Sequence, residues 1–142
     1  MSIADSVKQD LTTAMKAGEK ERVGALRLVL SELQKAAKDG NDDEQAILRR
    51  ERKRRLESAT AFRDAGRVEL AEGEESEAAI IGAYLPAELG EDELRKIVAD
   101  AIAESGASTP KDLGGVMKLA MEKTGGRADG KRVSALAREA LA

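Results

Sequence analysis

The stretch that decides the fold is LGGVMKLAMEKTGGRADGKRVSALAREAL, residues 113–141. Apolar residues recur on both sides of a central Gly-Gly pair at intervals of three and four, the spacing of one face of an α-helix. Gly125 and Gly126 suit the left-handed backbone that closes a helix, and Asp129 suits the N-cap of the next one. The stretch therefore predicts two amphipathic helices joined by a short turn.

The same turn contains the pattern G-x-x-x-x-G-K, from Gly125 to Lys131, which opens the phosphate-binding loop of many nucleotide hydrolases. That loop follows a buried strand and needs Ser or Thr directly after the lysine. Here the preceding residues have helical periodicity, and Arg132 follows the lysine. Because both tests fail, we interpret the stretch as a connection between helices.

A third amphipathic helix precedes these two, with its apolar face on residues 94, 97, 98, 101 and 102 and its end at Gly106. Thr109 and Pro110 suit the N-cap and first position of the helix that follows. The three helices predict a small bundle. Pro86 disfavours helical geometry at Leu85, so we divide the chain into an N-terminal domain, 1–86, and a C-terminal three-helix domain, 87–142.

The N-terminal domain has the pattern of a helical hairpin or bundle. Ser2 suits the first N-cap, Gly18 and Gly40 suit the ends of two helices, and further helices are expected over about 43–65 and 68–85. Strand-forming residues are scarce, so the predicted fold class is all-α. Two apolar faces leave alternatives open: Ala14 or Met15 on the first helix, and Leu56 or Ala59 on the third.

The chain contains no cysteine and no histidine. This excludes disulfides, thiolate nucleophiles, Cys/His zinc sites and Ser-His triads. No apolar run has the roughly 18 residues that a membrane span needs, and residues 1–11 lack the apolar core of a signal peptide. We expect a cytoplasmic protein without a membrane partner, and no catalytic, cofactor-binding or metal-binding residue. The acidic run 69–77 lacks EF-hand spacing, so we interpret it as a solvated helix face.

Charge is strongly segregated along the chain. Residues 49–67 hold eight basic and three acidic groups, whereas residues 69–94 hold nine acidic and no basic groups. We expect the run RRERKRR, 49–55, to pair with the acidic run 69–77 across an antiparallel helical hairpin. Each exposed pair contributes only about 0–1 kcal/mol, so the pairing would set register more than stability. The alternative is that this run contacts nucleic acid.

A second set of basic residues lies in the C-terminal domain, some near the predicted helix starts and two, Lys118 and Lys123, on the middle helix. Free N–H groups and the helix dipole favour anions at helix starts. The candidate nucleic-acid-binding residues are Lys111, Lys118, Lys123, Arg127, Lys131 and Arg132. The alternative is an ordinary solvated basic face.

Four segments, taken in order, resemble the GatB/YqeY-like family. They are SVKQDLTTAMKAGEKERVGALRLVLSELQ (6–34), AFRDAGRVEL (61–70), YLPAELGEDELRKIVADAIAESGAST (84–109) and KDLGGVMKLAMEKTGGRADGKRVSALAREAL (111–141). The resemblance implies an all-helical protein whose C-terminal part is similar to the tail domain of the B subunit of the glutamine-dependent aminoacyl-tRNA amidotransferase. In that enzyme the tail helps to hold the tRNA while the chemistry occurs elsewhere.

The resemblance therefore implies a non-catalytic, tRNA-binding or tRNA-associated accessory module, with tRNA and translation-related proteins as partners. The family is labelled, by association, with carbon–nitrogen ligase activity that uses glutamine. Independent catalysis is the weakest hypothesis, because no cysteine nucleophile exists and the serines are scattered. The other alternative is a protein–protein adaptor that uses the acidic region 69–93 and the apolar stretch AAIIGAYL, 78–85, without binding nucleic acid.

Overall fold

The computed structural model describes all 142 residues and consists of seven α-helices and one short 3-10 helix, with no strand. This confirms the predicted all-α fold class. The elements are α1 (Ile3–Ala17), α2 (Lys20–Lys38), α3 (Glu44–Asp64), α4 (Val68–Gly82), α5 (Glu91–Ser105), the 3-10 helix η1 (Pro110–Asp112), α6 (Leu113–Thr124) and α7 (Gly130–Leu141). They form two compact units, Met1–Pro86 and Ala87–Ala142.

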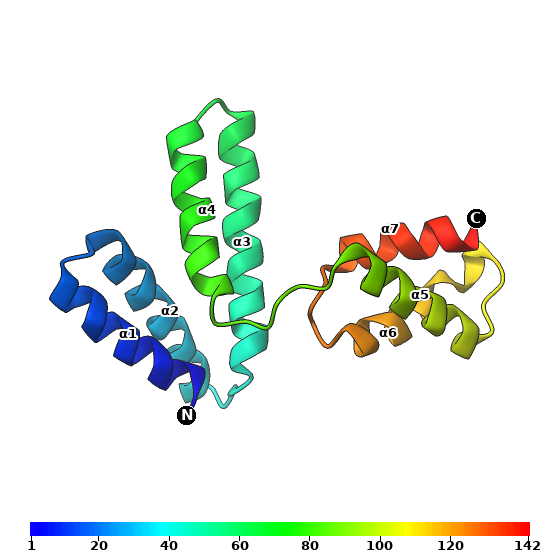
Figure 1. Cartoon of the computed structure of the whole chain (residues 1–142), viewed down its shortest axis with the longest axis horizontal. Helices are drawn as coiled ribbons and strands as arrows, with labels where there is room; N and C mark the ends of the chain where they lie inside the picture. The colour runs from blue at the N-terminus through cyan, green and yellow to red at the C-terminus, as the bar shows by residue number, and fades with distance from the viewer. The chain divides into compact units, whose positions relative to one another are not determined.

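In the N-terminal unit, α1 and α2 form one helical hairpin, and α3 and α4 form another (Figure 1). The common core lies at the base of both hairpins, where Leu26 and Leu33 of α2 meet Leu48 of α3 and Ile81 of α4. The half of the α3–α4 hairpin next to its turn extends beyond α1 and α2 (Figure 1). None of the residues from 49 to 79 belongs to this core.

The N-terminus of α1 is closed by hydrogen bonds from two directions. Ser2 Oγ accepts a hydrogen bond from the Asp5 N–H at 3.1 Å, as its predicted N-cap role requires. Glu44, at the start of α3, accepts hydrogen bonds from the N–H groups of Ile3 (2.9 Å) and Ala4 (2.8 Å). The carboxylate of Glu44 therefore fastens the start of α1 to the start of α3.

In the C-terminal unit, α5, α6 and α7 lie against one another (Figure 1). One aliphatic core is buried between them. Leu94 and Val98 of α5, Val116 of α6 and Val133 of α7 are 0–2% exposed. Gly125 and Gly126 both have positive φ, at 58° and 80°, and the Asp129 side chain accepts a hydrogen bond from the Lys131 N–H. The predicted pair of helices joined by a turn is confirmed. A nucleotide-binding loop would need a strand before the turn, where the structure has α6.

Two local expectations differ from the structure, and one alternative that the sequence left open is decided by it. The α4 helix ends at Gly82, because Tyr84 and Leu85 bond in tighter turns before Pro86. Pro110 opens a 3-10 turn, and the α-helix begins only at Leu113. Finally, Ala59 rather than Leu56 lies against α4: Ala59 is 3% exposed and Leu56 is 46% exposed.

Candidate nucleic-acid interface

Lys111 lies in a turn that is held by one carboxylate. Asp112 Oδ2 accepts hydrogen bonds from the N–H groups of Ser108 (3.0 Å) and Thr109 (3.1 Å). These backbone donors, first that of Ser108, lower the pKa of Asp112 from its ordinary value. Asp112 therefore fixes the chain just ahead of α6, and it leaves the exposed Lys111 side chain without an ion pair.

Lys118 shares a face of η1 and α6 with Lys111, seven residues earlier, because seven residues make about two helical turns. Gly114 and Gly115 lie between them, and a Cβ at either glycine would meet no heavy atom within 4 Å. The Lys118 side chain is exposed and has no ion pair. This face, which we call the glycine face, consists of Lys111, Gly114, Gly115 and Lys118. It combines two free ammonium groups with uncovered backbone.

Lys123 is held within the C-terminal unit instead. Its Nζ lies 2.7 Å from Glu104 Oε1, and the hydrogen bond to that carboxylate raises the pKa of Lys123. Only 28% of the Lys123 side chain is exposed. Lys123 is therefore a predicted site residue whose charge is already paired, with Glu104.

Arg127 and Arg132 serve mainly to tie the segment before α5 to the turn before α7. Arg127 Nε donates to the carbonyl of Thr124 at 3.1 Å, while the Arg127 carbonyl accepts from the Leu89 N–H at 2.8 Å. Arg132 Nη2 donates to the Leu89 carbonyl at 3.1 Å, and its Nη1 lies 4.0 Å from Glu88 Oε2. The Arg132 guanidinium therefore bonds the backbone of the buried Leu89, whereas the Arg127 guanidinium bonds within its own turn and only the Arg127 backbone contacts Leu89.

Lys131 begins α7, where Asp129 Oδ1 accepts its N–H at 3.2 Å, and its side chain is exposed without an ion pair. The six residues that the sequence grouped together therefore divide into two classes. Lys111, Lys118 and Lys131 are free cations, whereas Lys123, Arg127 and Arg132 are bonded inside the unit. A polyanion would meet the first three directly; of the other three, Arg127 is exposed and has no ion pair, so its charge is not neutralised within the unit.

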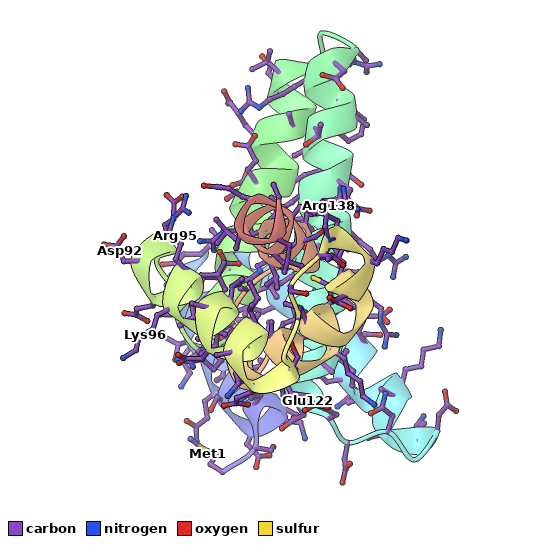
Figure 2. The ribbon with its side chains drawn as sticks, turned by 90° about the vertical axis from the view of Figure 1, so that its right-hand side faces the viewer. Met1, Asp92, Arg95, Lys96, Glu122 and Arg138 are labelled. Atoms are coloured by element: carbon purple, nitrogen blue, oxygen red, sulfur yellow. The ribbon has the colours of Figure 1, made fainter.

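The candidates predicted from the sequence do not include two further cations of the C-terminal unit that lack an ion pair. Lys96 on α5 and Arg138 on α7 are exposed and have no ion pair, whereas Arg95 bonds Glu91 and Glu139; Figure 2 labels Lys96, Arg95 and Arg138. The signal that could have found them is helical phase, because both lie opposite the apolar face of their helix. With nine basic and ten acidic residues, unit 87–142 is not basic overall, so any anion site on it is local.

A family model described as Yqey-like protein matches residues 4–141. The chain belongs to the YqeY-like family. This confirms the family resemblance drawn from the sequence. A comparison with curated proteins finds no match.

In this member of the YqeY-like family, the predicted pairing of the basic run 49–55 with the acidic run 69–77 is present at Arg55, whereas Arg54 pairs with Glu51 within the basic run and Arg63, beyond that run, adds a second pair across the hairpin. Arg55 pairs with Glu77 and lies 3.7 Å from Glu74, and Arg63 pairs with Glu75 at 2.7 Å. The Arg63–Glu75 bond lowers the pKa of Glu75 and raises that of Arg63. Most of the acidic run 69–77 is therefore occupied within the hairpin, and the stretch 78–85 packs largely in the core of its own unit.

No helix combines the length and the apolar character that a membrane crossing requires. The structure also contains no group of three or more acidic side chains placed as metal ligands would be.

Proposed function

We propose that this YqeY-like protein is a non-catalytic RNA-binding accessory module, with tRNA as its ligand, and that the glycine face makes the contact. The observation that carries the proposal is the pair of unpaired lysines, Lys111 and Lys118, on either side of two helical glycines. The family relation to the tail of the aminoacyl-tRNA amidotransferase B subunit supports tRNA as the ligand.

Gly114 and Gly115 are the second and third residues of α6, in its first turn, so the glycine cost that holds for a helix interior is an upper limit here. A glycine inside a helix destabilises it by about 1 kcal/mol relative to alanine. Neither Gly114 nor Gly115 is needed for close packing, since the space where a Cβ would lie is open. Their use is explained if another molecule approaches the α6 backbone closely, and a phosphate chain flanked by two ammonium groups suits such a surface.

Binding of this kind depends on charge and shape. No aromatic residue lies in the C-terminal unit, so base stacking contributes nothing there. If Lys111, Lys118 and Lys131 neutralise three phosphates, the affinity falls roughly 20- to 40-fold between about 50 and 200 mM salt. We therefore expect weak, salt-sensitive binding with little sequence readout.

The test compares two pairs of neutral substitutions in the same unit. K111Q/K118Q removes both cations of the glycine face, and K96Q/R138Q removes two other exposed cations of the same unit. The first pair should lower tRNA affinity and reduce the salt slope by about 2, at about 1 per lost phosphate contact. The control pair should leave that slope nearly unchanged. Fluorescence anisotropy with labelled tRNA at several salt concentrations measures both quantities.

Two outcomes would contradict the proposal. If the parent protein does not bind tRNA at about 50 mM salt, the RNA function is wrong. If K96Q/R138Q weakens binding as much as K111Q/K118Q does, the glycine face is the wrong site.

A further inference from the structure

The outer half of the α3–α4 hairpin buries very little apolar surface. Beyond Leu48 and Ile81 at its base, the buried residues of the two helices are Ala59, Ala71 and Ala78, each at most 3% exposed, and Glu51, which lies on the side of α3 toward α2. Two helices that share only a line of alanines gain little from packing, and helical hairpins in water depend on packing for stability. Packing of further helices against the outer half of the hairpin would therefore stabilise it.

One side of this hairpin, which we call the outer face, points away from α2. On α3 it includes Arg49, Leu56 and Arg63, and on α4 it includes Val68, Glu72 and Ala79, both sets at helical spacing. Two contacts show that the rows lie on the same side: Arg63 pairs with Glu75 at 2.7 Å, and a Cβ on Gly82 would lie 3.6 Å from Arg52. The opposite side carries Ile47 and Ile81, which pack with α2.

The outer face has exposed apolar groups between its charges. Leu56 is 46% exposed and Val68 is 47% exposed. The α3 row contributes the basic Arg49 and Arg63 to this face, and the α4 row contributes the acidic Glu72; Arg63 also pairs with Glu75 of its own chain. A surface with a positive row beside a negative row is complementary to itself when a twofold axis runs between the rows, because α3 then lies against α4 of the other copy.

We propose that the outer face binds the outer face of a second copy of this chain, with α3 of one copy against α4 of the other in an antiparallel four-helix arrangement. Leu56 then packs near Ala79 of the second copy, and Arg63 meets its acidic row. The opposite pairing, α3 against α3, would bring like charges together, which an interface disfavours.

The size of the face sets the expected strength. Two helices about 10 Å wide, each contributing about 15 residues at 1.5 Å per residue, make a face of about 20 by 22 Å. Burial of that face on both copies removes about 900 Å² from water, at the lower end of specific interfaces. The dimer should therefore be weak and concentration-dependent. It does not rest on the RNA function, which uses the other unit.

The first experiment is sedimentation velocity on the full chain between about 1 and 200 µM, the range in which a weak dimer populates. The parent protein should shift from monomer toward dimer. L56E should remain monomeric, because it places a carboxylate against the acidic row. The matched control is L28E, since Leu28 is an equally exposed leucine, at 49%, on α2. A monomeric parent at every concentration, or equal loss of dimer in L28E, overturns the proposal.

The second experiment tests which helices face each other in the dimer. Because the chain has no natural cysteine, every disulfide must form between introduced cysteines. L56C and A79C are prepared separately, mixed and oxidised. The proposed pairing predicts that the mixture forms the disulfide between the two different variants faster than either variant links to itself. Faster self-linking of L56C would mean α3 against α3, and no linking in any sample would mean no such interface. Circular dichroism of each variant confirms that its helices are intact.

Discussion

Replacement of Glu44 by alanine should weaken the N-terminal unit by detaching α1 from α3. The carboxylate accepts the N–H groups of Ile3 and Ala4 at 2.9 and 2.8 Å, although these residues are 40 or more positions away in sequence. They are the first two of the four N–H groups that a helix leaves without intrahelical partners. Glu44 also places a negative charge at the positive end of the α1 dipole.

The magnitude follows from the geometry. A hydrogen bond to a charged group contributes about 1.5–3 kcal/mol when the bond is buried. Ile3 and Ala4 are only half-buried, so water can replace part of both bonds in Glu44→Ala. We therefore expect a loss of about 2 kcal/mol in the free energy of unfolding for the pair. Glu44→Gln keeps one acceptor oxygen and should lose about 1 kcal/mol.

The assay is urea unfolding followed by the fluorescence of Tyr84. This is the only tyrosine, and the chain has no tryptophan, so the signal reports on the N-terminal unit alone. The control is Glu57→Ala, which removes an exposed carboxylate from the same helix that has no hydrogen bond or ion pair. An exposed change of this kind alters stability by at most about 0.5 kcal/mol. The reasoning is refuted if Glu44→Ala and Glu57→Ala have the same effect.

Three further predictions concern other parts of the molecule. Leu94→Ala, at a fully buried position, should cost about 2–5 kcal/mol and unfold the C-terminal unit, with a fall in helical circular dichroism but unchanged Tyr84 fluorescence. Unchanged thermal unfolding would contradict this. Burial, and then the hydrogen bond to Asp10, raises the pKa of Tyr84, so this group's contribution is complete below its unfolded pKa of about 10 and is lost as pH rises further. Tyr84→Phe should remove that alkaline loss in urea unfolding followed by circular dichroism at several pH values, since this variant lacks the fluorescent tyrosine, and an identical alkaline profile would disprove the role. Finally, Glu104→Gln should tighten tRNA binding and steepen its salt slope by about 1, because it releases Lys123; anisotropy measures this, and an unchanged slope counts against it.

The positions and ends of the helices were largely readable from the sequence, because their determinants are local. Ser2, Gly18, Gly125 and Asp129 each act within a few residues of their own position. The charge pairing of α3 with α4 was also readable, because oppositely charged runs on consecutive antiparallel helices must lie side by side. Where two residues competed for one helical face, as Leu56 and Ala59 did, the sequence left both open.

The division of the candidate site into free and bonded cations required the tertiary structure. Lys123 meets Glu104 and Arg132 meets Leu89 over separations of 19 and 43 residues, and no spacing rule foresees such contacts. The same holds for Glu44, whose partners lie on another hairpin. By itself, then, the sequence determined the helices, their order and their charges, because helical periodicity and capping act over a few residues. Which cations face solvent was decided only by the packing of helices, because an ion pair depends on distance in space.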